Sequence, residues 1–178
     1  MDLQQLSEDL SREDAYPHPA GEVLVIQTHI SILFLAGPYV YKVKKPVNFG
    51  FLDFSTLERR RHFCEEEVRL NRRLAPDVYL DVRPITLDTL DGGKARMGGE
   101  GEAVDYAVQM KRLPGERTLL EILRRGEFQA GTLNEMARRI AEFHRTAASG
   151  EEISEWGRWE AVAGNHRENF EQVLPAVD

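Results

Sequence analysis

The stretch Tyr39-Val40-Tyr41-Lys42-Val43-Lys44-Lys45-Pro46 decides the fold of this chain. Apolar and basic residues alternate along it, Gly37-Pro38 precedes it and a proline closes it, which is typical of a β-strand entered from a tight hairpin. Because successive side chains of a strand point to opposite faces of a sheet, Val40, Lys42 and Lys44 share one face. The sequence therefore predicts a strand that presents two lysines to one side of a sheet.

A long helix is predicted downstream of this strand. Ser55-Thr56-Leu57-Glu58 has the Ser-x-x-Glu spacing of a capping box, and the periodic run that it opens ends at Ala75-Pro76. The apolar stripe expected on this helix consists of Phe63, Glu67, Leu70 and Leu74. Burying the Glu67 carboxylate alone would be costly, so we expect a lysine of the neighbouring strand to pair with it.

The composition is that of a globular protein with a core of its own. The chain has 178 residues, of which 42% are hydrophobic, and this length is enough for one ordinary domain. No apolar run approaches the roughly 18 residues of a membrane span, and the acidic first segment does not resemble a secretion signal. The single cysteine, Cys64, excludes a disulfide framework. We therefore expect a cytoplasmic protein without membrane contact.

Charge is distributed unevenly along the chain. The formal net charge of −7 argues against a general nucleic-acid binder. Residues 39–74, in contrast, hold nine lysines and arginines against five acidic residues. We expect most of these arginines, Arg59-Arg60-Arg61 among them, to lie on a water-exposed helix face. That leaves the lysine strand as the part that could meet a phosphate.

Further elements complete an α+β pattern. Alternation predicts additional strands at residues 23–27, 32–36, 79–88 and 103–111, with glycine-rich turns at residues 91–101. Helices are predicted at residues 2–11, after the capping boxes that begin at Thr118 and Thr132, and at residues 165–174, with a break over residues 146–155. The fold expected is an antiparallel five-stranded sheet plus one long helix, followed by a helical segment.

The order of these elements and several motifs resemble a known family. The motifs are Ile26-Gln27-Thr28-His29-Ile30-Ser31, Val40-Tyr41-Lys42-Val43-Lys44-Lys45-Pro46, Gly50-Phe51-Leu52-Asp53-Phe54-Ser55 and Phe63-Cys64-Glu65-Glu66-Glu67. They are similar to a bacterial branch of the aminoglycoside phosphotransferase-like proteins, in which a P-loop ATPase-like domain often follows the kinase-like domain. The resemblance implies a protein-kinase-like, nucleotide-binding N-lobe at residues 1–113 and the beginning of a helical C-lobe, incomplete, at residues 114–178.

The resemblance also implies which residues hold the phosphates of ATP. Lys42 matches the lysine that contacts the α- and β-phosphates in kinase-like folds, and Glu67 matches its carboxylate partner. Strand parity alone does not separate Lys42 from Lys44, and Glu66 is the second choice for the carboxylate.

Two further segments match parts of a nucleotide site. The turn that contains Thr28 and Ser31 lies where kinase-like folds cover the phosphates, although it contains no glycine. Met110, Lys111 and Leu113 match the hinge whose backbone groups meet adenine. A simple turn and a strand end explain these segments equally well on sequence alone.

One part of the family pattern is missing. Kinase-like transfer needs an aspartate at the acceptor hydroxyl, and an aspartate and an asparagine for Mg²⁺. After Asp105 the only aspartate is Asp178, and no His-Gly-Asp or His-Arg-Asp loop is present. We therefore expect the ATP-binding portion of a phosphotransferase acting on a small-molecule hydroxyl, with its catalytic loop and Mg²⁺ ligands in a missing C-terminal part. The alternative is a non-catalytic nucleotide-binding or regulatory module.

The partners expected are ATP and an unidentified small-molecule acceptor, without nucleic acid. An incomplete C-lobe would also leave apolar helix residues without their cover. These residues are Leu133, Met136, Ile140 and Phe143. Exposed apolar patches promote association, so self-association through this segment is a further expectation.

Overall fold

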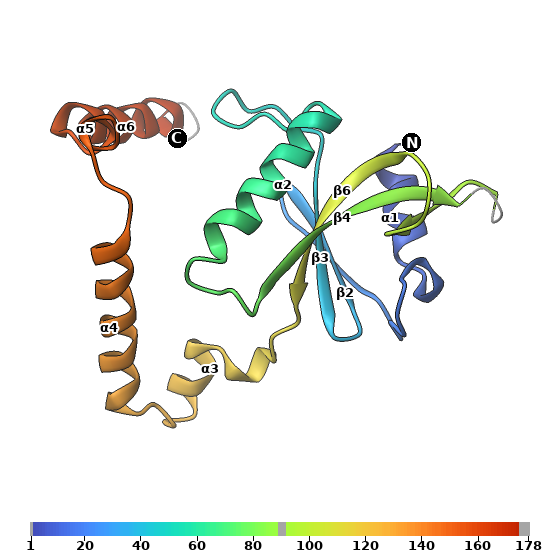
Figure 1. The fold of residues 1–178 in the computed structure, drawn as a ribbon, viewed down its shortest axis with the longest axis horizontal. Coiled ribbons are helices and arrows are strands. Elements are labelled where there is room, and N and C mark those ends of the chain that lie inside the picture. The colour runs from blue at the N-terminus through green and yellow to red at the C-terminus, as the bar shows by residue number, and fades with distance from the viewer. Residues whose placement is uncertain (1, 89–91, 175–178) are drawn as a thin grey trace. The chain divides into compact units, whose positions relative to one another are not determined.

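The computed structural model describes residues 2–88 and 92–174 (Figure 1). Its helices are α1 (Leu3–Leu10), α2 (Leu57–Asn71), α3 (Leu119–Arg124), α4 (Ala130–Thr146), α5 (Glu151–Trp156) and α6 (Trp159–Val173), with short 3-10 turns η1 (Glu13–Ala15) and η2 (Gly115–Arg117). Its strands are β1 (Leu24–Gln27), β2 (Ser31–Ala36), β3 (Tyr39–Lys44), β4 (Tyr79–Asp88), β5 (Lys94–Met97) and β6 (Ala103–Lys111). The α+β class expected from the sequence is confirmed.

Contacts within the chain define two compact units, residues 1–128 and residues 129–178. The first contains the sheet with α1, α2 and α3, and the second contains α4 to α6. The functional boundary expected after residue 113 stays a prediction.

The sheet has six strands in the order β1-β2-β3-β6-β4-β5, and all neighbouring pairs are antiparallel. The expected count of five is therefore wrong. The additional strand, β5, pairs with β4 in the register Ile85↔Met97 to Asp88↔Lys94. It has only four residues between glycine pairs, so its sequence looks like part of a long turn. Tertiary contact supports it, because Asp9 of α1 accepts a 2.8 Å hydrogen bond from the backbone N–H of Ala95.

The two faces of the sheet carry different clusters, as the alternation along β3 requires. One face packs against α1: Tyr41 and Val43 of β3 are buried with Leu6 and Leu10 of that helix. The other face packs against α2, where Cys64 and Val68 contact Val108. In Figure 1, α2 lies across one side of the strands and α1 lies on the other. Lys42 and Lys44 lie on the α2 side, since Tyr41 and Val43 occupy the α1 side.

Helix α2 forms where the capping box predicted it, with two corrections. The N-cap is Thr56, whose hydroxyl accepts from the backbone N–H of Arg59, so the cap is one residue later than the expected Ser55. The buried face consists of Arg60, Cys64 and Val68. The predicted stripe is wrong in phase, because Phe63, Leu70 and Leu74 are 39%, 46% and 41% exposed. Arg60, expected in water, is buried instead.

The helices after β6 match the predictions unevenly. Thr118 caps α3 as predicted, its hydroxyl accepting from the backbone N–H of Glu121. Helix α4 begins two residues before Thr132, α5 begins within the region 146–155 where a break was predicted, and α6 begins at Trp159, earlier than the expected residue 165. On α4, Leu133, Met136 and Ile140 are 55%, 42% and 48% exposed, while Phe143 is half-buried. Self-association through these residues stays a prediction.

No helix within residues 2–88 and 92–174 is long and apolar enough to cross a membrane.

Candidate functional site

One glutamate on α2 receives two lysines from β3. The Nζ atom of Lys42 lies 2.9 Å from Oε1 of Glu67, and the Nζ atom of Lys44 lies 2.7 Å from Oε2. The expected contact between Lys42 and Glu67 is therefore present, and Lys44 shares the same carboxylate. Glu66, the second choice, points elsewhere and pairs with Arg69 on the exposed side of the helix.

The lysine-glutamate cluster, as we call Lys42, Lys44 and Glu67, carries one positive charge in excess when its three groups are ionised. Burial alone would raise the pKa of Glu67, but hydrogen bonds from Lys44 and Lys42 outweigh it and hold this pKa below its ordinary value. The carboxylate is therefore ionised at neutral pH, and one of the two ammonium charges remains uncompensated within the cluster.

The two lysines are not equivalent. The Lys44 side chain is only 6% exposed, and its ammonium lies 4.8 Å from the centre of the Phe54 ring. The Lys42 side chain is 26% exposed. A ligand at the surface of the sheet can therefore reach Lys42 more readily, while Lys44 lies beneath the loop that precedes α2 and helps to fix Glu67.

A second ion pair lies two turns earlier on the same face of α2. Arg60 Nε donates to both carboxylate oxygens of Asp105, at 2.9 and 3.1 Å, and Arg60 Nη1 donates to the carbonyl of Phe54. Burial raises the pKa of Asp105 above its ordinary value despite the guanidinium beside it. Between the two pairs, Cys64 is fully buried and burial raises its pKa to about 12. That thiol is therefore not a nucleophile.

A partly open apolar surface adjoins Lys42 on the same face of the sheet. Strand register places two rows side by side: Ile26, Leu33, Lys42 and Val108, and then Leu24, Leu35, Val40 and Met110. We call the apolar members of these rows, without the buried Val108, the apolar strip. Leu24 and Ile26 are 44% and 50% exposed, and the other members are half-buried. A cation beside an apolar surface suits a ligand with an anionic end and a flat apolar end.

The sequence did not single out the apolar strip apart from Met110. Its residues belong to strands in which apolar and other residues alternate, and the same sequence pattern is expected for a sheet face that is fully covered by the core. Only the strand order, with β1 at the sheet edge, shows that this part of the face extends beyond the contacts of α2.

The turn between β1 and β2 is closed by its own hydrogen bonds. The Thr28 hydroxyl accepts from the backbone N–H of Ser31 and donates to the Ser31 carbonyl, which also receives the Thr28 backbone N–H. Ser31 is 1% exposed and lies opposite Lys44 in the β2–β3 register. Both residues therefore lie at the Lys44 end of the site. Thr28 is exposed with its hydroxyl engaged in the turn, whereas the Ser31 hydroxyl is buried and has no hydrogen-bond partner among the described residues.

The predicted hinge is the end of β6 and the connector after it. The backbone N–H of Lys111 donates to the Val78 carbonyl, and that of Arg112 donates to the Pro38 carbonyl. Met110 lies in the apolar strip next to Val40, and Leu113 is 60% exposed. The structure thus brings Met110 close to the Lys42 row and leaves the Lys111 and Leu113 side chains at the surface.

In the described ranges, 2–88 and 92–174, no three histidine, cysteine or acidic side chains come together in a way that could hold a metal ion.

Comparison with known proteins gives relatives whose names assign no activity. No protein-family model and no solved structure match the chain. "Uncharacterized protein Rv2004c" of Mycobacterium tuberculosis (strain ATCC 25618 / H37Rv) is 33% identical over 164 residues, which cover 90% of this chain. "Uncharacterized protein Mb2027c" of Mycobacterium bovis shows the same identity and coverage. The chain spans 31% of the length of each of these curated relatives.

Proposed function

We propose that this chain is the nucleotide-binding, N-lobe-like part of a kinase-like phosphotransferase, and that its ligand is ATP. The observation that carries the proposal is the lysine-glutamate cluster, which joins a central strand to the helix packed on it. In kinase-like folds a strand lysine held by a helix glutamate contacts the α- and β-phosphates. The excess positive charge of the cluster favours an anionic ligand at this position.

The parts of the site take separate roles in this proposal. Lys42, the more exposed lysine, contacts the phosphates, and the ion pair with Glu67 positions its ammonium. Lys44 holds the other carboxylate oxygen, so Glu67 stays in place when Lys42 turns toward a ligand. The adenine ring lies on the apolar strip beside Met110, where a planar base can replace water over apolar side chains.

The hinge role proposed for Lys111 and Leu113 would use main-chain groups other than the Lys111 N–H, because that group donates to the Val78 carbonyl. The roles of Thr28 and Ser31 are indirect, since their hydrogen bonds fix the turn rather than meet a ligand. Transfer itself is not assigned to residues of this chain, because no aspartate lies between Asp105 and Asp178. For the longer protein, we propose phosphorylation of a small-molecule hydroxyl, in the manner of the aminoglycoside phosphotransferase-like proteins, with Mg²⁺ held outside this chain.

Titration calorimetry with ATP, ADP and adenosine tests the proposal. We expect a dissociation constant for ATP on the order of 0.1–1 mM, with little dependence on Mg²⁺. Lys42→Ala should weaken ATP and ADP binding by about tenfold or more and change adenosine binding less than about twofold, because it removes a phosphate contact and spares the apolar strip. Lys45→Ala is a matched control directly after the same strand, since the Lys45 ammonium contacts Gln27 and not Glu67.

Two outcomes would contradict these roles. Equal losses for all three ligands in Lys42→Ala would mean that Lys42 supports the fold rather than the phosphates. If ATP at millimolar concentration produced no heat at all, the proposal that this chain has a nucleotide site would fail.

A second candidate is a non-catalytic nucleotide-binding or regulatory module. The observation behind it is that the lysine-glutamate cluster can hold an anion without any residue that performs transfer. A longer protein that contains this chain, binds ATP and transfers no phosphate to any hydroxyl compound or to water would support this candidate over the enzyme.

A further inference from the structure

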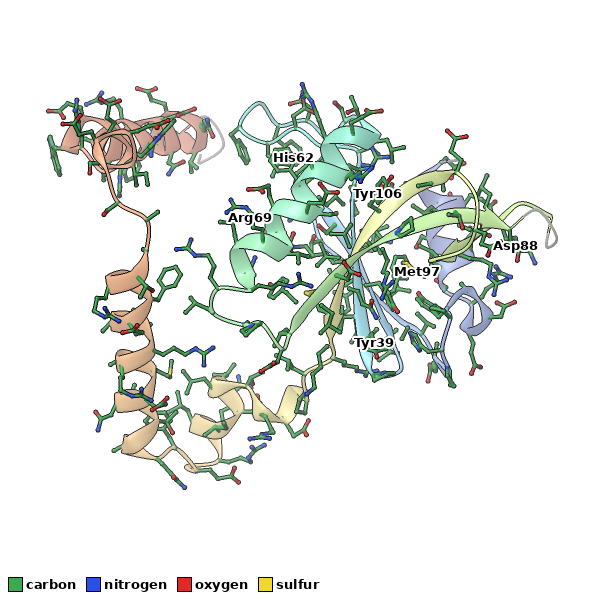
Figure 2. The ribbon with its side chains drawn as sticks, in the orientation of Figure 1. Tyr39, His62, Arg69, Asp88, Met97 and Tyr106 are labelled. Carbon is green, nitrogen blue, oxygen red and sulfur yellow. The ribbon has the colours of Figure 1, made fainter. Side chains whose placement is uncertain are left out.

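A cavity lies on the face of the sheet opposite the lysine-glutamate cluster. Its volume is about 360 Å³, and its lining consists of Pro17, His18, Tyr39, Tyr41, Arg83, Met97, Gly98 and Gln109. Figure 2 labels Tyr39 and Met97, which lie on the side of the sheet away from α2. We call it the tyrosine cavity. Its volume falls within the range of small-molecule sites.

A directed chain of hydrogen bonds forms the floor of the tyrosine cavity. Arg83 Nε donates to Gln109 Oε1 at 2.8 Å, and Gln109 Nε2 donates to the Tyr41 hydroxyl at 3.2 Å. That hydroxyl lies 3.0 Å from His18 Nε2, and His18 Nδ1 lies 3.1 Å from the Pro19 carbonyl. Because a carbonyl only accepts, Nδ1 donates, and in the neutral ring Nε2 then accepts the proton of Tyr41.

The Tyr41, Gln109 and His18 members of this chain of hydrogen bonds are held in place by burial or by ring contacts, whereas Arg83 is about half exposed. Tyr41 and Gln109 are 1% and 7% exposed. The rings of His18 and Tyr39 meet edge to face at 5.0 Å between centroids, and Tyr16 packs at 5.2 Å from Tyr41. A polar network fixed in this way within aromatic walls is a preformed surface for a flat ligand.

The charge of the cavity comes from Arg83. Among the described residues that line the cavity, Arg83 is the one with a permanent charge. Its Nε–H is used by Gln109, and its Nη2 lies 3.9 Å from Asp81. The side chains of Arg83 and Asp81 are both about half exposed, so this long contact neutralises little of the guanidinium charge. The fork of Arg83 therefore remains able to bind a carboxylate in bidentate fashion.

We propose that the tyrosine cavity binds a small carboxylic acid with a flat apolar body. Its carboxylate would contact Arg83, and its body would pack between Tyr39, Met97 and Pro17. The site is separate from the proposed nucleotide site, because Tyr41 and Lys42 point to opposite faces of β3. Its existence does not depend on whether the chain binds ATP.

A titration followed by amide chemical shifts tests the proposal, with sodium benzoate as the charged probe and benzamide as its uncharged isostere. Benzoate should shift the amide signals of Tyr39, Gly98 and Gln109 and leave those of α2 unchanged. Arg83→Met should weaken benzoate binding by about tenfold or more and should change benzamide binding less than about twofold. Arg83→Lys keeps the positive charge but lacks the planar guanidinium, so its affinity for benzoate should lie between those of the wild-type chain and Arg83→Met.

Arg117→Met is the matched control, because it removes the same charge from an exposed position in η2. It should leave benzoate binding unchanged. Thermal unfolding of each variant separates loss of the site from loss of the fold. Arg83→Met also removes the donor to the buried Gln109 Oε1, so its midpoint should fall modestly, and the titrations are run at a temperature where every variant is folded. Benzamide binding as tight as benzoate, equal losses in Arg83→Met and Arg117→Met, or no shifts around the cavity would each overturn the proposal.

Discussion

Helix α2 presents two charged side chains to the same sheet, and their surroundings differ. Arg60 meets a single carboxylate, Asp105, so the charges balance. Glu67 meets two lysines, so its cluster keeps one positive charge in excess. The side chains of the first pair are 10% and 7% exposed, whereas that of Lys42 is 26% exposed. The first pair is closed to solvent, and the second opens on one side.

This difference separates a structural ion pair from a site that can take a ligand. A balanced buried pair gains nothing from another ion, which would have to displace Asp105 or leave the buried Arg60 without compensation. A cluster with an excess positive charge is stabilised by an anion placed at its open side. The open side of the lysine-glutamate cluster adjoins the apolar strip, whereas Arg60 donates to the carbonyls of Phe54 and Ser55.

Removing Arg60 should have the largest effect on stability. Arg60→Met leaves the Asp105 carboxylate buried without its partner, so we expect the free energy of unfolding to fall by about 3–5 kcal/mol. Urea unfolding followed by circular dichroism measures it. Arg61→Met, on the exposed side of the same turn, is the control and should change stability by about 0.5 kcal/mol or less. If Arg60→Met lowered the free energy of unfolding by less than about 1 kcal/mol, the pair of Arg60 and Asp105 would not be shielded from solvent as we describe.

The two lysines should divide stability and binding between them. Lys44→Met removes a buried hydrogen bond to a carboxylate, so we expect a loss of about 1.5–3 kcal/mol in the free energy of unfolding. Lys42→Met removes a more exposed contact and should cost about 1 kcal/mol or less. Denaturant unfolding of both variants under one condition gives the comparison. A larger loss from Lys42 than from Lys44 would reverse the roles that we assign to them.

Much of the sheet could be predicted because alternation is a local property. Strands β1, β2, β3, β4 and β6 lie within a residue of their predicted ranges. Strand β5 could not be predicted, since four residues between glycine pairs carry too little pattern. Its contacts are non-local: it pairs with β4, and the backbone N–H of Ala95 donates to Asp9, which is far from it in the sequence.

The site illustrates the same limit. The contact between Lys42 and Glu67 followed from a carboxylate among apolar helix residues, yet the stripe that suggested it was out of phase. Phe63 and Leu70 looked like core residues because they are apolar, and Arg60 looked solvated because it is charged. Arg60 is buried because it pairs with Asp105, and this partner lies 45 residues away in the sequence. The sharing of Glu67 by Lys44 likewise needed the register of strand against helix.

The smallest effect expected is a difference in the pH dependence of stability between the two acids. Hydrogen bonds from two lysines hold the pKa of Glu67 below its unfolded value of about 4.3, despite its burial. Its contribution to stability is therefore present above pH 4.3 or so and is lost as pH falls through its folded pKa. Burial raises the pKa of Asp105 above its unfolded value of about 3.9. Its contribution is therefore present below that value and is lost as pH rises through its folded pKa.

Unfolding measured in urea at several pH values between about 3 and 6.5 tests these opposite signs in the window where both acids titrate. The advantage of the wild-type chain over Glu67→Gln should shrink as pH falls. Relative to Asp105→Asn, the wild-type chain should gain stability over the same fall in pH. Because both variants replace a carboxylate with an amide of similar shape, titrations elsewhere in the chain cancel in each comparison. Parallel trends in the two variants would show that Glu67 and Asp105 occupy equivalent electrostatic environments, and the distinction between a closed pair and an open cluster would fail.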